Sequence, residues 1–211
     1  SNVSIPRQVE EAVKGGCRWI QFRLKEKTEE EWQNILYKTK AICDEYEAAL
    51  IINDHVTMAL GVNSTGVHLG NEDMRPDKAR QLLGRNKIIG GTANTFEEIK
   101  KLYSIGVDYI GIGPYQSDAT KNKTSPALGL EGYKNLMCRM RSAGINLPVI
   151  AIGGIKAEDT EDLLNLGIDG IAVSSVIAFH HNPRKITEEL IHKLKRESND
   201  FQDKQNNEQP D

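Results

Sequence analysis

The stretch TFEEIKKLYSIGVDYIGI, residues 95–112, shows the unit from which this chain is built. Thr95 and Glu98 have the spacing of a capping box, which predicts that a helix begins at Thr95. Gly106 comes where the helical periodicity stops, and a left-handed glycine can close the last turn there. The aliphatic run Val107–Ile112 then predicts a strand. The stretch therefore predicts a helix, a glycine and a buried strand in succession.

The same unit recurs along the chain, with further helix ends predicted at Gly144 and Gly167. We predict strands over Cys17–Arg23, Ala48–Asn53, Gly66–Leu69, Lys87–Gly91, Val107–Ile112, Pro148–Ile152 and Gly170–Val173. We predict helices over Arg7–Lys14, Thr28–Tyr46, His55–Gly61, Pro76–Leu83, Thr95–Ile105, Gly129–Ala143, Ala157–Leu166 and Pro183–Lys195. Because parallel neighbours need crossover connections, this alternation indicates a parallel sheet. A single (β/α)8 barrel, an α/β fold, suits a chain of 211 residues.

The two ends of the chain depart from a regular barrel. A barrel needs eight strands, and a strand should precede the helix over Arg7–Lys14. Only Asn2–Ile5 is available there, so we expect the first strand to be short or missing in this chain. Residues 196–211 contain almost no apolar side chains. We therefore expect a barrel domain over residues 1–195 and a polar, disordered tail over residues 196–211.

Composition argues against several classes of function. The net charge is −3, and no Lys/Arg run is long enough to suggest a nucleic-acid partner. No apolar stretch approaches the roughly 18 residues of a membrane span, and no secretory leader is evident, so we expect a cytoplasmic protein. The three cysteines fit neither a disulfide framework nor a zinc site. The sequence leaves a homo-oligomer open.

Polar side chains gather at the predicted strand ends, where β/α barrels build their active sites. Gln21, Arg23 and Lys25 alternate onto one face and would offer an amide and two cations to one cavity. Cations there would need an anionic partner. The alternative is that Arg23 and Lys25 lie beyond the strand and point into solvent.

Two carboxylates follow the next two predicted strands. Asp54 comes directly after Asn53, and Asp73 follows the strand Gly66–Leu69. Mg²⁺ commonly takes one or two carboxylates together with substrate phosphates, so Asp54 and Asp73 are candidate magnesium ligands. Asp54 could instead cap the helix after it. Magnesium beside several cations indicates a diphosphate substrate.

The remaining strand ends could bind a second anion. Thr92 and Asn94 lie near the mouth, and the loop over residues 111–129 carries Thr120 and Lys121. Loops of this length are often functional lids, although a single loop lysine can also be merely solvated. The glycines and serines after the last two strands could bind phosphate through backbone N–H groups: Gly153, Gly154, Ser174 and Ser175. The glycine pair could also serve only a tight turn. Two anion sites suggest a two-substrate reaction with a diphosphate leaving group. His68 lies inside a predicted strand, and we expect it to be structural.

In order and spacing, six motifs resemble the thiamine phosphate synthase family from about Val9 to Ile177: QFRLK, INDHV, GVHLGNED, GPYQSDATK, AIGGI and AVSSVI. The resemblance implies a Mg²⁺-dependent transferase of thiamine biosynthesis. Such an enzyme condenses 4-amino-2-methyl-5-hydroxymethylpyrimidine diphosphate with 4-methyl-5-(2-phosphooxyethyl)thiazole to give thiamine phosphate and diphosphate. In this family the diphosphate is thought to leave first.

The resemblance also implies a role for each matching residue. Asp54 and Asp73 would hold Mg²⁺, and the diphosphate would be bound by Gln21, Arg23, Lys25, Asn53 and Lys121. Thr92 stands where the family usually has serine, and it keeps the hydroxyl. The thiazole phosphate would be bound by Thr120, Gly154, Ser174 and Ser175. Arg23, Lys25, Thr92 and Lys121 would be catalytic by stabilising charge on the leaving diphosphate.

Three departures from the family keep other functions open. Asp118 stands where the lid usually has threonine, Asn94 stands where histidine is frequent, and the first strand is poor. A related thiazole tautomerase would use a histidine at the position of Asn94. A non-catalytic paralogue that binds thiamine precursors would not need both aspartates. A sugar-phosphate isomerase or aldolase would need an acid, base or lysine inside the barrel, and none is evident.

Overall fold

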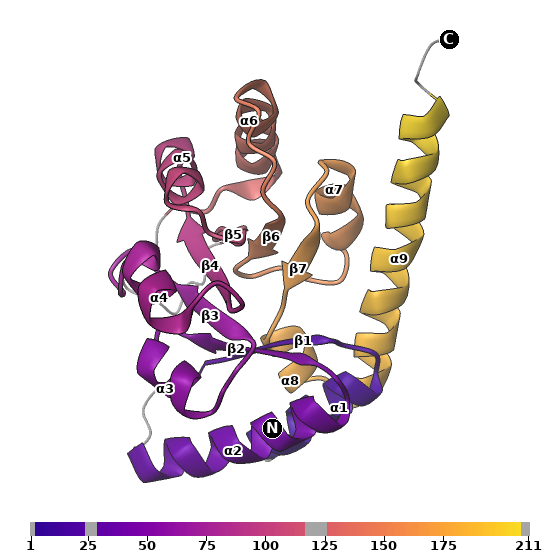
Figure 1. Cartoon of the computed structure of the whole chain (residues 1–211). Coiled ribbons are helices and arrows are strands. Elements are labelled where there is room, and N and C mark those ends of the chain that lie inside the picture. Colours follow the sequence, from indigo (N-terminus) through magenta and orange to yellow (C-terminus); the bar gives the residue numbers. More distant parts are fainter. Residues whose placement is uncertain (1–2, 24–28, 117–125, 208–211) are drawn as a thin grey trace.

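A computed structural model describes residues 3–23, 29–116 and 126–207 (Figure 1). Its strands form one parallel sheet in the order β1-β2-β3-β4-β5-β6-β7, so each strand pairs with its neighbours in sequence. The strands are β1 (Trp19–Phe22), β2 (Ala49–Asn53), β3 (Gly66–Leu69), β4 (Ile88–Ala93), β5 (Tyr109–Ile112), β6 (Val149–Ile152) and β7 (Gly170–Ala172). All seven predicted strands are present, and the predicted α/β barrel class is confirmed.

Helices connect the strands and cover the outer face of the sheet (Figure 1). They are α1 (Ile5–Lys14), α2 (Glu29–Glu45), α3 (Val56–Gly61), α4 (Pro76–Leu83), α5 (Phe96–Ile105), α6 (Gly129–Ser142), α7 (Thr160–Asn165), α8 (Ser175–Ala178) and α9 (Pro183–Asn207). The sequence did not predict α8, because a helix of 4 residues shows no periodicity.

The first barrel strand is missing among the described residues, as expected. Pro6 occupies the first turn of α1, where its fixed φ favours a helix over a strand. Consequently β1 and β7 are the two edges of the sheet and do not pair with each other. Trp19 on the edge strand β1 keeps 43% of its surface exposed.

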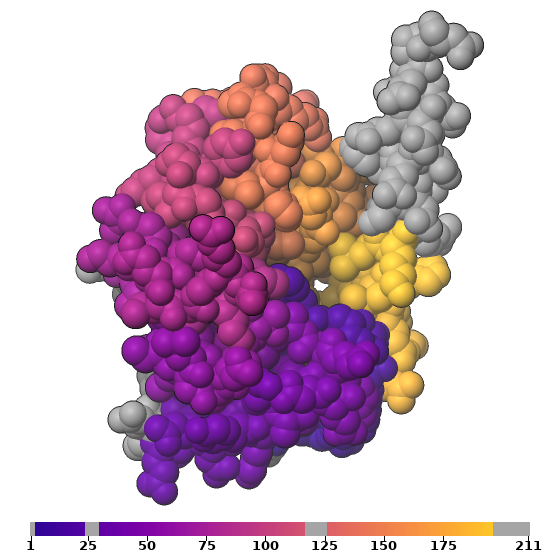
Figure 2. All heavy atoms as spheres, viewed as in Figure 1, coloured from indigo at the N-terminus to yellow at the C-terminus, as the bar shows by residue number. Residues whose placement is uncertain are grey.

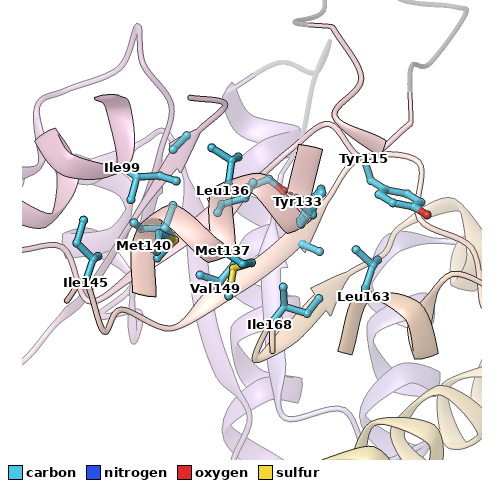
Figure 3. Close-up of a cluster of buried hydrophobic side chains, with 14 of the residues drawn as sticks. Ile99, Tyr115, Tyr133, Leu136, Met137, Met140, Ile145, Val149, Leu163 and Ile168 are labelled. Carbon is cyan, nitrogen blue, oxygen red and sulfur yellow. Dashed lines mark hydrogen bonds between the residues drawn. The ribbon is translucent and has the colours of Figure 1, made fainter. Parts of the chain in front are cut away.

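Two apolar clusters fill the space between the sheet and the helices. One cluster joins β4, β5 and β6 to α5, α6 and α7, and includes Tyr133, Met140 and Leu163 (Figure 3). The other joins α1, α2, α3 and α4 to β1, β2 and β3, and includes Trp32 and Leu36. These clusters hold the strands in register, and the register sets which side chains meet inside the barrel.

The helix ends follow the predicted chemistry. The Thr95 hydroxyl accepts a hydrogen bond from the Glu98 backbone N–H at 3.3 Å, and the Glu98 carboxylate accepts one from the Thr95 N–H at 3.0 Å. This pair is a complete capping box. Gly106, Gly144 and Gly167 have φ values of 84°, 66° and 82°, as predicted for glycines that close helices.

Helix α9 is longer than predicted. We predicted that it would end at Lys195 and that residues 196–211 would be disordered, but the backbone stays helical to Asn207. Residues 196–207 contain neither proline nor glycine, and several are strong helix formers. The scarcity of apolar residues in this stretch therefore did not mean that the helix ends. The division into a domain over residues 1–195 and a tail after it stays a prediction.

Helix α9 runs beside the open side of the sheet, where its first half packs against α1, α7 and α8. Figure 2 shows this segment, in yellow, against the indigo N-terminal part of the chain. Among the helices of the described ranges, none is long and apolar enough to cross a membrane.

Candidate active site

The strand register brings the predicted diphosphate-binding residues to one edge of the sheet. Gln21 at the end of β1 donates a hydrogen bond from Nε2 to Oδ1 of Asn53 at 2.7 Å. Asn53 is 7% exposed, and Arg23 follows β1 with an exposed side chain. Gln21 and Asn53 thus form an amide pair, and Arg23, which lies beyond the strand, is near enough to favour the charged form of Asp54. Lys25 lies outside the described residues.

Asp54 and Asp73 lie together beside this pair. Asp54 has a left-handed backbone with φ of 67°, which aspartate tolerates better than most residues. Its N–H donates to the His68 carbonyl at 2.9 Å, which ties the end of β2 to β3. The Asp73 carboxylate accepts a hydrogen bond from the Gly70 N–H at 2.7 Å. His55, and not Asp54, occupies the N-cap of α3, so the helix-cap interpretation of Asp54 is wrong.

The electrostatics of the two acids suit a bound cation. Burial, together with a hydrogen bond and charge repulsion from Asp73, raises the pKa of Asp54 to about 6. The positive charge of Arg23 partly offsets this rise. Two half-buried carboxylates within hydrogen-bonding reach of each other fit a hard divalent ion, which would neutralise them and keep positions for phosphate and water. Among the described residues no group of three or more metal-binding side chains occurs.

A polar chain crosses the inside of the barrel below these acids. His68 Nε2 lies 2.9 Å from Thr92 Oγ1, and His68 Nδ1 lies 2.9 Å from the Tyr109 hydroxyl. Burial lowers the pKa of His68 to about 4, so the ring is neutral at pH 7. The expectation that His68 is a structural histidine with both nitrogens hydrogen-bonded is confirmed. One of these hydrogen bonds joins the ring to Thr92, a predicted site residue.

The histidine partner Tyr109 is a residue that the sequence interpretation missed. Strand pairing aligns Asn53 with His68, His68 with Gly90, and Gly90 with Tyr109. Residues aligned in this way share a face, so the glycine in this row leaves room for a large neighbour. The position of Tyr109 inside the barrel depends on the register across β3, β4 and β5, which the structure gives and the sequence alone does not.

Asn94 has a structural role at the mouth. Its side-chain amide donates a hydrogen bond to the Gly113 carbonyl, and its backbone N–H donates to Glu98 at 2.7 Å. This asparagine therefore ties the end of β4 to the end of β5.

The predicted second anion site is described only in part. Gly153 and Gly154 are both left-handed, with φ of 88° and 71°, and a Cβ on Gly154 would lie 2.9 Å from the Gln116 side chain. The glycines are thus required by the turn, and Gly154 is exposed. Ser174 and Ser175 are exposed where β7 passes into α8. Thr120, Lys121 and Asp118 lie outside the described residues, so their predicted roles stay predictions.

Comparison with known proteins places the chain among close relatives. The family described as thiamine monophosphate synthase matches residues 2–177. Thiamine-phosphate synthase of Bacteroides thetaiotaomicron is 48% identical over 180 residues, covering 85% of this chain and 86% of that protein. Its counterpart from Bacteroides fragilis is 45% identical over 190 residues, covering 90% of this chain and 93% of that protein.

A solved structure agrees with the sequence relatives. Thiamine phosphate pyrophosphorylase from Pyrococcus furiosus superposes with a TM-score of 0.81 at 32% identity, covering 92% of this chain and 91% of that one. The matched family, the curated relatives and the shared fold lead to one conclusion. This chain belongs to the thiamine-phosphate synthase family of transferases.

Proposed function

We propose that this protein condenses 4-amino-2-methyl-5-hydroxymethylpyrimidine diphosphate with 4-methyl-5-(2-phosphooxyethyl)thiazole in a Mg²⁺-dependent reaction. The observation that carries the proposal is the meeting of Asp54, Asp73 and Arg23 beside the Gln21–Asn53 amide pair. A paired set of acids next to a cation and amides suits a metal–diphosphate group better than a carboxylate or a sugar.

The chain's own residues would bind and orient the diphosphate. The Gln21–Asn53 hydrogen bond holds both amides in place before substrate arrives, so little side-chain ordering is needed on binding. Arg23 would place its guanidinium on the diphosphate, with Lys25 and Lys121 proposed as further cations. Thr92 would add a hydroxyl from β4. The thiazole phosphate would bind at Thr120, Gly154, Ser174 and Ser175.

Asp54 and Asp73 would hold the Mg²⁺ ion. When bound, the ion supplies positive charge that stabilises the leaving diphosphate. The raised pKa of Asp54 fits this role, because an approaching cation would favour the ionised form of both carboxylates.

The bond changes need no protein nucleophile and no general base. The C–O bond between the pyrimidine methylene and the diphosphate breaks, and the diphosphate leaves with the electron pair. The thiazole nitrogen then forms a C–N bond to the methylene carbon. Cations and hydrogen-bond donors that are already in place can lower the barrier for such a charge-separating step.

A thiazole tautomerase is the second candidate, and Asn94 weighs against it. An amide does not titrate, and this one is already bonded to the Gly113 carbonyl. A non-catalytic precursor-binding protein would not need two facing carboxylates. A cytoplasmic location and a homo-oligomer remain predictions.

Diphosphate release by the purified protein tests the proposal, with each substrate and Mg²⁺ omitted in turn. We expect release only when all three are present. Asp54→Ala and Lys121→Ala should nearly abolish turnover, whereas Glu72→Gln, an exposed acid next to Asp73, should not. No release from the complete mixture, with thiazole phosphate still bound, would instead favour the tautomerase or the non-catalytic protein.

A further inference from the structure

The polar chain Tyr109–His68–Thr92 is built into the barrel interior from three neighbouring strands, β5, β3 and β4. His68 is 5% exposed and Tyr109 is 6% exposed. Buried polar groups of this kind persist only when they are hydrogen-bonded, and both heteroatoms of the imidazole are. The chain ends at Thr92 Oγ1, a half-buried hydroxyl near the end of β4.

Glycines on the facing strands make room for the two rings. A Cβ on Gly90 would lie 2.2 Å from Cζ of Tyr109, and a Cβ on Gly111 would lie 2.9 Å from Cε1 of His68. Neither glycine has a left-handed backbone, so the turn geometry does not require them. The space they leave is used to hold the tyrosine and histidine rings in one arrangement.

The direction of the hydrogen bonds follows from the available protons. Within the described ranges the side-chain hydrogen bonds of His68 go to two hydroxyls and to no carboxylate, so the buried ring carries one N–H and one lone pair. Among the described residues, Nδ1 of His68 is the hydrogen-bond partner found for the Tyr109 hydroxyl. If His68 donated from Nδ1, the buried tyrosine proton would have no acceptor there, which is costly. Tyr109 therefore donates to Nδ1, and the proton on Nε2 is donated to Thr92.

We propose that His68 and Tyr109 are positioning residues that make the Thr92 hydroxyl an obligatory hydrogen-bond donor to the substrate. This inference rests on the proposed function, in which Thr92 faces the diphosphate. Because Thr92 Oγ1 accepts from His68, its own proton is not used within the part of the chain that the structure describes. An anionic oxygen accepts hydrogen bonds only, so a hydroxyl fixed as a donor is matched to it.

Nitrogen NMR of the imidazole ring tests the proton positions without any substrate. Long-range ¹⁵N–¹H spectra distinguish the two neutral tautomers, and His68→Gln identifies the signals of His68. We expect the Nε2–H tautomer alone at pH 7 in the unaltered protein. In Tyr109→Phe we expect signals of both neutral tautomers, because Nδ1 no longer accepts the tyrosine proton. A Nδ1–H form, or a protonated ring at pH 7, would overturn the proposal even if the enzyme is a synthase.

Kinetics test whether Tyr109 acts through Thr92. We expect Tyr109→Phe to lower kcat about tenfold, the size of one lost hydrogen bond, with KM for the thiazole phosphate unchanged. In a Thr92→Val background, Tyr109→Phe should have no further effect on kcat. Thr92→Ser, which keeps the hydroxyl that Thr92→Val removes, should retain most of the parent kcat. Additive losses in the double variant would refute action through Thr92.

Tyr133→Phe is the matched control. Tyr133 is also a buried tyrosine, but its hydroxyl bonds to the Ile112 carbonyl and the Ile152 N–H outside the barrel interior. The control should lose stability and keep kcat. A similar kcat loss in both tyrosine variants would mean that Tyr109 has only a structural role. Complete absence of diphosphate release in the unaltered protein would reject the proposed function, while the tautomer result would stand by itself.

Discussion

Replacing Gly90 by alanine should destabilise the barrel, although the backbone itself allows the change. The new Cβ would lie 2.2 Å from Cζ and 2.6 Å from the hydroxyl oxygen of Tyr109. Carbon atoms normally approach to about 3.5 Å, so the ring must move by roughly 1 Å or more. Overpacking of this kind costs about 1–3 kcal/mol, and losing the buried Tyr109–His68 bond costs about 1–3 kcal/mol more. Alanine has less backbone entropy than glycine in the unfolded chain, and this offsets less than about 1 kcal/mol of the cost.

We therefore expect Gly90→Ala to lower the free energy of unfolding by about 2–5 kcal/mol. Urea titration followed by circular dichroism measures it, with Gly61→Ala as the control. Gly61 ends α3, and a Cβ there would meet nothing within 4 Å, so that variant should match or slightly exceed the parent. If Gly90→Ala unfolded at the same urea concentration as the parent, Tyr109 would not fill the space in front of Gly90.

Three further variants check other parts of the structure. Asp54→Asn, measured with excess chelator, should gain about 1–3 kcal/mol at pH 7.5. Because the pKa of Asp54 is raised to about 6, the stability that it contributes below its unfolded pKa is lost as pH rises through 6. The gain should therefore shrink at pH 5, and equal urea midpoints at pH 7.5 would contradict the repulsion. Thr95→Ala should cost about 1 kcal/mol through the lost capping box, whereas Thr95→Ser should cost less. Tyr133→Phe should cost about 1 kcal/mol in the same urea assay, because the hydrogen bonds of the Tyr133 hydroxyl to the Ile112 carbonyl and the Ile152 N–H are lost.

Local chemistry made most of the fold predictable. Gly66–Leu69 and Pro76–Leu83 were predicted to the residue, since each is bounded by a glycine, a proline or a change of period. The end of α9 was missed because the scarcity of apolar residues was taken as disorder, while residues 196–207 contain no proline or glycine that would end the helix.

The site was predictable along each strand but less so across them. Alternation placed Gln21 and Arg23 together, and the order of strand ends placed Asp54 near Asp73. The Tyr109–His68 bond depends on how far β3 and β5 are shifted relative to each other through β4. A shift of one residue would turn either side chain outward, and no local signal in the sequence sets that shift.

The separation between the outer apolar layer and the inner polar face explains why the barrel interior can hold polar residues. Facing carboxylates at the mouth raise the free energy of the folded chain without a cation, and a histidine whose pKa is lowered to about 4 destabilises the folded chain as pH falls below 6.5. Two apolar clusters outside the sheet stabilise the fold independently of these groups. Stability and chemistry are thus separated in space: the outer layer secures the register, and the register brings together the acids, the amide pair and the Tyr109–His68–Thr92 chain. Variants of the outer layer should therefore change urea midpoints and leave kcat unchanged, whereas inward-facing polar variants should change kcat, with or without a change in the urea midpoint.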